Sequence, residues 1–186
     1  MGFAVELYLD SLTDAKVRRV WASLAEAGIN SHLITVGARP HVSLAVFGEL
    51  DPECLRADMQ DFARVTPQFA FRLSSVGTFG SDEGVVYIAP ERTQTLTETH
   101  RRYHERLARL GALPSRYYWP GVWRPHCTVA MHVTSDKIEA AVCVCQAADV
   151  LGEGRFTEIG LIEFGGTLAK TNHLYSFPLS GATAPV

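Results

Sequence analysis

The sequence predicts an α+β protein with a bilobal internal duplication, in which two opposed antiparallel sheets line a central cleft and helices pack outside. The stretch Arg-Pro-His-Val-Ser at residues 39–43 returns as Arg-Pro-His-Cys-Thr at residues 124–128, and the two histidines lie 85 residues apart (126 − 41). The hydrophobic pattern around each copy also repeats, as strand, helix, motif strand, helix and strand. With 186 residues, 47% of them hydrophobic, the chain can form one such domain with a sizeable interior.

The first half of the duplication covers residues from about 3 to 90. Alternating apolar residues predict strands, apolar residues at helical spacing predict helices, and glycine or proline marks where elements end. We expect a strand at 3–10, then a helix that has Ser11 and Thr13 as N-cap candidates and ends at Gly28, and then strands near 32–36 and at 41–47. A second helix should start at Asp51-Pro52, and strands at 69–79 and 84–90 should follow, joined by the turn Gly-Ser-Asp-Glu-Gly.

The second half covers residues 91–180 and repeats this order. We expect a helix from about 91 to 110, an aromatic-rich loop, a strand at 126–133, a helix from about 135 to 148, and strands near 155–164 and 172–179 around a Gly165-Gly166 turn. Residues 1–180 should form a single domain whose lobes exchange strands, followed by a loose tail at 181–186.

Each motif strand should present one polar and one apolar face, because side chains alternate along a strand. The faces expected to be open are His41, Ser43, Ala45 and Phe47 in the first copy and His126, Thr128, Ala130 and His132 in the second. The faces expected to pack on the core are Val42, Leu44 and Val46 in the first copy and Cys127, Val129 and Met131 in the second.

Two imidazoles and two hydroxyl groups that converge on one cavity suit the chemistry of phosphoesters. One neutral histidine of the pair His41 and His126 can accept a proton from an attacking water, and the other, protonated, can donate to the leaving oxygen. Ser43 and Thr128 can donate to the non-bridging oxygens, where the charge resides. This scheme needs no metal and no cofactor.

Five further residues are candidates for binding substrate. Arg39 and Arg124 could neutralise a phosphate, although solvated side chains at a loop edge fit them equally well. Tyr118 and Trp119 could stack on a base, or could belong to a packed loop. His132 could line the outer cleft, or could be a surface histidine at the end of a strand.

Two other groups of histidines are poor candidates for a metal site. A site made of His41, His126 and His132 lacks a carboxylate or thiolate that would complete a plausible ligand set. His100 and His104 share a helix at four-residue spacing, but the arginines around them favour a solvated face with Tyr103 turned inward.

Composition limits the class of partner. The chain has 17 basic and 20 acidic residues and a net charge of −3, so it lacks the basic stripe expected of proteins that track long nucleic acids or bind anionic membranes. The four cysteines form no Cys-x-x-Cys pair, and we find neither a signal peptide nor an apolar run of membrane-spanning length. We therefore expect a cytoplasmic, monomeric protein that acts on a small nucleotide or a short RNA end.

The paired tetrads His-Val-Ser-Leu at 41–44 and His-Cys-Thr-Val at 126–129 resemble the 2H phosphoesterase superfamily, in particular its bacterial 2′-5′ RNA ligase-like branch, related to RNA 2′,3′-cyclic phosphodiesterases. The aromatic-rich run before the second tetrad is also similar to that family, and the likeness covers about residues 3–180. It implies a bilobal fold, His41 and His126 as the acid/base pair, Ser43 and Thr128 as phosphate ligands, and metal-independent opening of a cyclic phosphate. Ser43 stands where threonine is commoner.

Two alternatives to a cyclic phosphodiesterase stay open. One is a phosphodiesterase acting on 2′-5′ linked oligonucleotides or cyclic signalling nucleotides, and the other is a module that binds RNA ends or nucleotides without turning them over. A panel of substrates with product analysis would separate them.

Overall fold

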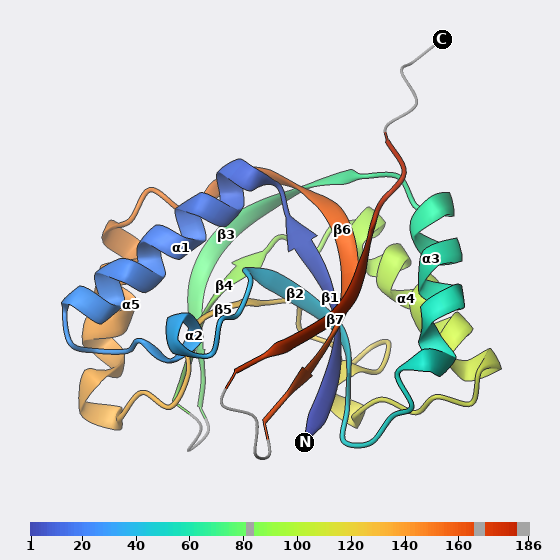
Figure 1. The fold of residues 1–186 in the computed structure, drawn as a ribbon. Helices are drawn as coiled ribbons and strands as arrows, with labels where there is room; N and C mark the ends of the chain where they lie inside the picture. The colour runs from blue at the N-terminus through green and yellow to red at the C-terminus, as the bar shows by residue number, and fades with distance from the viewer. Residues whose placement is uncertain (81–83, 166–169, 182–186) are drawn as a thin grey trace, which may run out of the picture.

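A computed structural model describes residues 1–80, 84–165 and 170–181 and has the expected α+β architecture, with helices on the outside of a sheet (Figure 1). The strands are β1 (Gly2–Leu9), β2 (His41–Phe47), β3 (Phe69–Phe79), β4 (Val85–Pro90), β5 (Cys127–Ala130), β6 (Gly152–Phe164) and β7 (Asn172–Pro178). The helices are α1 (Ser11–Glu26), α2 (His32–Thr35), α3 (Glu53–Val65), α4 (Gln94–Arg109) and α5 (Ile138–Ala147), and short 3-10 turns lie at Arg116–Tyr118 and Ser135–Lys137.

Two local predictions in the first half are wrong. The strand expected near 32–36 is the short helix α2, whose start is fixed by the Asn30 side chain, which accepts a hydrogen bond from the His32 backbone at 3.2 Å. The cap of α1 is Asp10, which accepts from the backbone of Leu12 and Thr13, so neither Ser11 nor Thr13 caps the helix. Both elements begin at an Asx side chain that bonds the backbone two or three residues on.

Three predicted features fall partly outside the described residues. Positions 81–83 of the turn at 80–84, position 166 of the glycine turn and positions 182–186 of the tail are not described.

The sheet is antiparallel throughout, with the strand order β2-β1-β6-β3-β4-β5 and β7 paired to β6. The two sheets expected from the duplication are thus joined into one, because the first residues of β3 pair with the first residues of β6. The strands β2 and β5 stand at the two ends of this order and nevertheless touch each other. The sheet therefore curls until the two motif strands meet.

The helices form two pairs on opposite sides of the molecule (Figure 1). On one side α1 packs on α5 and on β5. On the other side α3 and α4 meet through an edge-on contact of Phe62 and Tyr103, and α4 packs on β2. The first helix of each half thus covers the motif strand of the other half.

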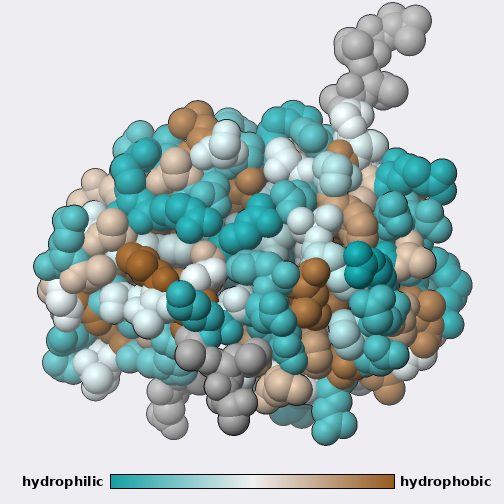
Figure 2. Space-filling view, in the orientation of Figure 1, coloured by the Kyte–Doolittle hydropathy of each residue, from teal (hydrophilic) through white to brown (hydrophobic). Residues whose placement is uncertain are grey.

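The face of the molecule drawn in Figure 2 is largely hydrophilic over α1 and across the centre, and its hydrophobic side chains form small separate groups. The fully buried core lies beneath, and the largest of its side chains are Trp123, Tyr8, Tyr103, Phe47, Phe62 and Phe156.

The solvated face predicted for His100 and His104 is wrong, although Tyr103 is buried as expected. His100 is 2% exposed and its ring stacks on Trp123 with the centroids 3.9 Å apart. His104 Nε2 donates to the Leu44 carbonyl at 3.0 Å. Burial is the main reason that the pKa of His100 falls to about 3, so both rings are neutral core groups that tie α4 to β2.

We predict that Gly84→Ala destabilises the protein strongly. Gly84 has a φ of +55°, and an added Cβ would overlap the backbone carbonyl of Val133. The left-handed backbone and the overlap together should lower the free energy of unfolding by about 2–4 kcal/mol, measured by chemical denaturation. Gly28→Ala is the matched control: its φ is +65°, but nothing lies within 4 Å of the added Cβ, so only about 1 kcal/mol should be lost. Equal losses in the two variants would contradict the packing argument.

Candidate active site

Both motif strands carry a bulge at the same place. In β2 the pairing with β1 goes from Glu6 opposite Ser43 to Val5 opposite Ala45, and in β5 the pairing with β4 skips Val129 in the same way. A bulge adds one residue to a strand and moves the following side chains to the other face. The motif histidine and hydroxyl therefore share one face, but the residues after the bulge do not.

The open face predicted beyond the hydroxyls is accordingly wrong. Ala45 and Ala130 are fully buried and Phe47 is 2% exposed, so all three join the core.

The two motif histidines are held in the same way. His41 Nδ1 lies 2.7 Å from the Arg39 carbonyl, and His126 Nδ1 lies 2.7 Å from the Arg124 carbonyl. A carbonyl only accepts, so Nδ1 carries the proton in each neutral ring and Nε2 is left for chemistry. The proline before each histidine fixes the backbone from which this contact is made.

His41 and His126 lie close to each other. The backbone of His41 is hydrogen-bonded to the thiol of Cys127, the residue next to His126. Burial lowers the pKa of both imidazoles, and the neighbouring charge of His41 lowers the pKa of His126 further. The structure thus brings together the two histidines that the sequence singled out.

The surroundings of the two histidines differ. His41 Nε2 lies 3.2 Å from a carboxylate oxygen of Glu6, which is 1% exposed. His126 instead contacts aromatic rings, with Phe79 edge-on at 4.8 Å and Tyr87 at 5.5 Å between centroids. Glu6 is not among the candidates predicted from the sequence, although it is the one acidic residue in an otherwise apolar strand.

Two tyrosines lie flat against glycines beside the histidines. An added Cβ at Gly160 would come within 2.6 Å of the Tyr8 ring, and one at Gly77 within 2.7 Å of the Tyr87 ring. A side chain at either position would have to push the tyrosine ring away. Tyr8 pairs directly with His41 in the sheet, so the ring forms part of the floor beside that histidine.

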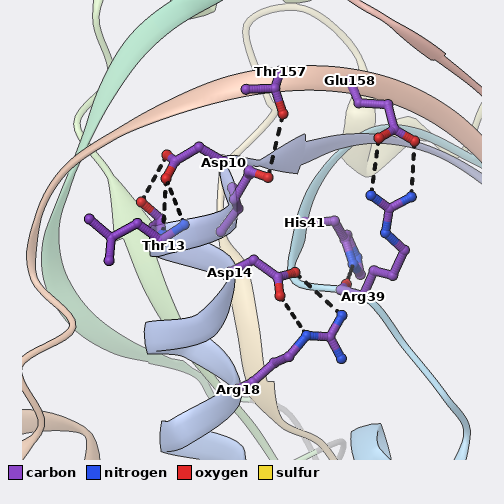
Figure 3. Close-up of polar contacts among 10 residues, drawn as sticks. Asp10, Thr13, Asp14, Arg18, Arg39, His41, Thr157 and Glu158 are labelled. Atoms are coloured by element: carbon purple, nitrogen blue, oxygen red, sulfur yellow. Dashed lines mark hydrogen bonds and ion pairs between the residues drawn. The ribbon is translucent and has the colours of Figure 1, made fainter.

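Arg39 is not simply solvated (Figure 3). Its two terminal nitrogens bond both oxygens of Glu158 at 3.0 and 3.2 Å, and its guanidinium lies 3.7 Å from the centre of the Tyr8 ring. Such a bidentate pair fixes the position of the guanidinium beside the site. In the same view Asp14 and Arg18 of α1 form an ion pair, which is drawn below His41.

The remaining candidates lie as follows. Ser43 is 8% exposed and pairs with Glu6 in the sheet, and its backbone carbonyl accepts a hydrogen bond from Trp123 Nε1. Thr128 is half-buried and pairs with Tyr87. Arg124 is exposed. Tyr118 packs partly against the core and its carbonyl bonds His100, while Trp119 is 50% exposed and donates to the Pro114 carbonyl. His132 is exposed with a φ of +59° and meets His32 edge-on, beyond the end of β5.

A surface hollow of about 400 Å³ between α4 and residues 112–120 is separate from the histidine pair, and its lining includes Leu113, Pro114 and Trp119. The described ranges contain no group of three or more His, Cys, Asp or Glu side chains able to hold a metal ion. Within the same ranges, every helix is too short or too polar to cross a bilayer.

Comparison with known proteins identifies the family of the chain. The family model described as the 2′-5′ RNA ligase superfamily matches residues 15–167. Comparison with curated protein sequences gave no significant match.

Several solved structures share the fold at low sequence identity. A crystal structure of a phosphoesterase has a TM-score of 0.64 and 18% identity, over 96% of this chain and 97% of that one. LigT from E. coli in its apo form has a TM-score of 0.64 and 16% identity, over 96% and 97%. TT0787 from Thermus thermophilus has a TM-score of 0.62 and 20% identity, over 98% and 100%. With the family match spanning most of its length, the chain belongs to the 2′-5′ RNA ligase superfamily of 2H phosphoesterases.

Proposed function

We propose that this protein is a metal-independent phosphodiesterase that opens a cyclic nucleotide phosphate, such as the 2′,3′-cyclic phosphate at an RNA end, by two-histidine acid/base catalysis. The observation that carries the proposal is the matched tethering of two neighbouring histidines, His41 and His126, through Nδ1, which turns the Nε2 atom of each ring away from its own backbone for proton transfer. Two groups that exchange protons from fixed positions are what hydrolysis of a phosphodiester requires.

In this mechanism one Nε2 accepts a proton from water as the water oxygen bonds to phosphorus. The other Nε2 donates a proton to the ribose oxygen as its bond to phosphorus breaks. Ser43 and Thr128, which share the faces of the two histidines, donate to the non-bridging oxygens. The product is a phosphate monoester with one free hydroxyl, and the atoms of one water have been added.

A small nucleotide substrate is consistent with what is known of one structural relative. LigT from E. coli has been crystallised with 3′-AMP and with phosphate. The net charge of −3 and the Glu158 partner that neutralises Arg39 also favour a substrate with a single phosphate over a long polyanion.

We expect His41→Ala and His126→Ala each to lower kcat on nucleoside 2′,3′-cyclic monophosphates by about 10²–10⁴-fold, because each removes one proton-transfer group. The rate of the wild type should be the same with and without EDTA. His32→Ala, which removes an imidazole from α2, is the control and should keep the wild-type rate, with thermal unfolding confirming that all variants fold. Full activity in either alanine variant would rule out the two-histidine mechanism.

The hydroxyl groups are tested separately. Ser43→Ala and Thr128→Val should each reduce kcat/KM by about a hundredfold, since one donor to the charged oxygens is lost in the transition state. Both should also weaken inhibition by inorganic phosphate. Thr134→Ala serves as the control, because Thr134 follows His132 at the same spacing, in His132-Val133-Thr134, but is exposed beyond β5. If the phosphate inhibition constant did not change in Ser43→Ala and Thr128→Val, the hydroxyls would not be phosphate ligands.

A further inference from the structure

Glu6 is a buried carboxyl group beside the reacting edge of a proposed catalytic histidine. It lies in the middle of β1 and is 1% exposed. Its Oε1 is 3.2 Å from His41 Nε2, and its Oε2 is buried with no hydrogen-bonding partner among the described residues. A carboxylate in this position is poorly solvated, so its neutral form is strongly favoured.

The groups that face Glu6 come from several elements. They are Tyr8 on β1, His41 on β2, Arg39 before β2, His173 on β7 and Cys127 on β5. Arg39 already bonds Glu158 through both terminal nitrogens. Its positive charge is therefore largely neutralised by Glu158 and stabilises a Glu6 carboxylate only weakly. Burial outweighs the hydrogen bond of Tyr8 and the charges of His173 and Arg39, and it raises the pKa of Glu6 to about 8. Near neutral pH Glu6 therefore carries a proton.

The two halves of the duplication differ at this position. In β1 Glu6 pairs with the motif residue Ser43, and in β4 the residue that pairs with the motif residue Thr128 is Tyr87. The sheet thus places a carboxyl group beside His41 and a phenol ring beside His126. Only the first histidine has an acidic partner at its Nε2 in the described structure.

The proposed reaction needs a proton that the histidines alone hold poorly. Burial lowers the pKa of both imidazoles, so both are largely neutral at pH 7. A neutral pair can accept a proton from water but has none to give to the leaving oxygen. A third group that retains a proton at neutral pH would remove this shortage.

We propose that Glu6 is a positioning residue that shares one proton with His41 Nε2 and makes that proton available to the leaving oxygen. The inference rests on the proposed function. The Glu6 O–H donates to Nε2, and when the bond from phosphorus to the ribose oxygen breaks, that oxygen takes the shared proton at this edge of His41, which leaves a Glu6 carboxylate and a neutral His41 ring. His126 takes the proton of the attacking water and releases it to solvent, from which Glu6 regains its own.

The first test is an NMR titration of the histidine rings without substrate, with the His41 signal assigned from its loss in His41→Ala. In the wild type the His41 ring should respond twice, once below pH 6.5 and again near pH 8 when the shared proton is lost. Glu6→Gln should abolish the step near pH 8. Glu163→Gln removes a carboxyl group from β6 that accepts from Asn172, and should keep both steps.

The second test is the pH profile of hydrolysis. Wild-type kcat should fall on the alkaline side near pH 8, where the shared proton is lost. In Glu6→Gln this limb should move below pH 6.5, so that kcat at pH 7.5 drops by at least about tenfold while KM changes little. Glu6→Asp keeps a carboxyl group with a shorter reach and should restore part of the alkaline activity. It also replaces Glu6→Gln in the titration if that variant does not fold.

The outcomes separate the two proposals. An unchanged His41 titration in Glu6→Gln overturns proton sharing whatever the activity, and an unchanged pH profile overturns the positioning role. If the wild type hydrolyses no phosphodiester, the proposed function fails, and the titration still decides whether Glu6 and His41 share a proton.

Discussion

The pairing of β3 with β6 is the constraint on which the rest of the structure depends. Their hydrogen bonds near Phe69 and Phe156 join the strands β2, β1, β6 and β7 to the strands β3, β4 and β5, and each of these two groups holds strands of both halves of the duplication. Because the sheet curls around this joint, its edge strands β2 and β5 come into contact. The two motifs, far apart in the chain, thereby reach one place. Neither repeat alone could bring a second imidazole to the first.

Within this frame the backbone is duplicated more faithfully than the side chains. Both motifs share the tethered Nδ1 and the bulge after the hydroxyl. These features set where the reacting atoms lie, and they depend on backbone geometry that a repeat preserves. The side chains beside the two rings, Glu6 and Tyr87, are different. A symmetric scaffold can in this way support chemistry that needs two unequal histidines.

The class of fold, most strands and the approach of the two motif strands to each other could be predicted from the sequence, because alternation, helical spacing and a repeated tripeptide are local patterns. The bulges could not, since inserting Leu44 against β1 depends on pairing with a distant strand. The burial of His100 could not be predicted, because the arginines on the same helix suggest a solvated face. Its ring is buried because it stacks on Trp123, which comes from another segment of the chain. Glu6 was visible as a single charge in an apolar strand, but its partner at His41 is set only by the register of β1 and β2.

The exchange of first helices between the halves has a consequence for how the molecule behaves as a whole. Because α1 lies on β5 and α4 lies on β2, each repeat would leave an apolar strand face bare if the other were removed. The two repeats are therefore not expected to fold independently of each other. The chain should melt in one cooperative transition, and a fragment cut at the midpoint would recover its missing helix only from a second copy of itself or from the complementary fragment.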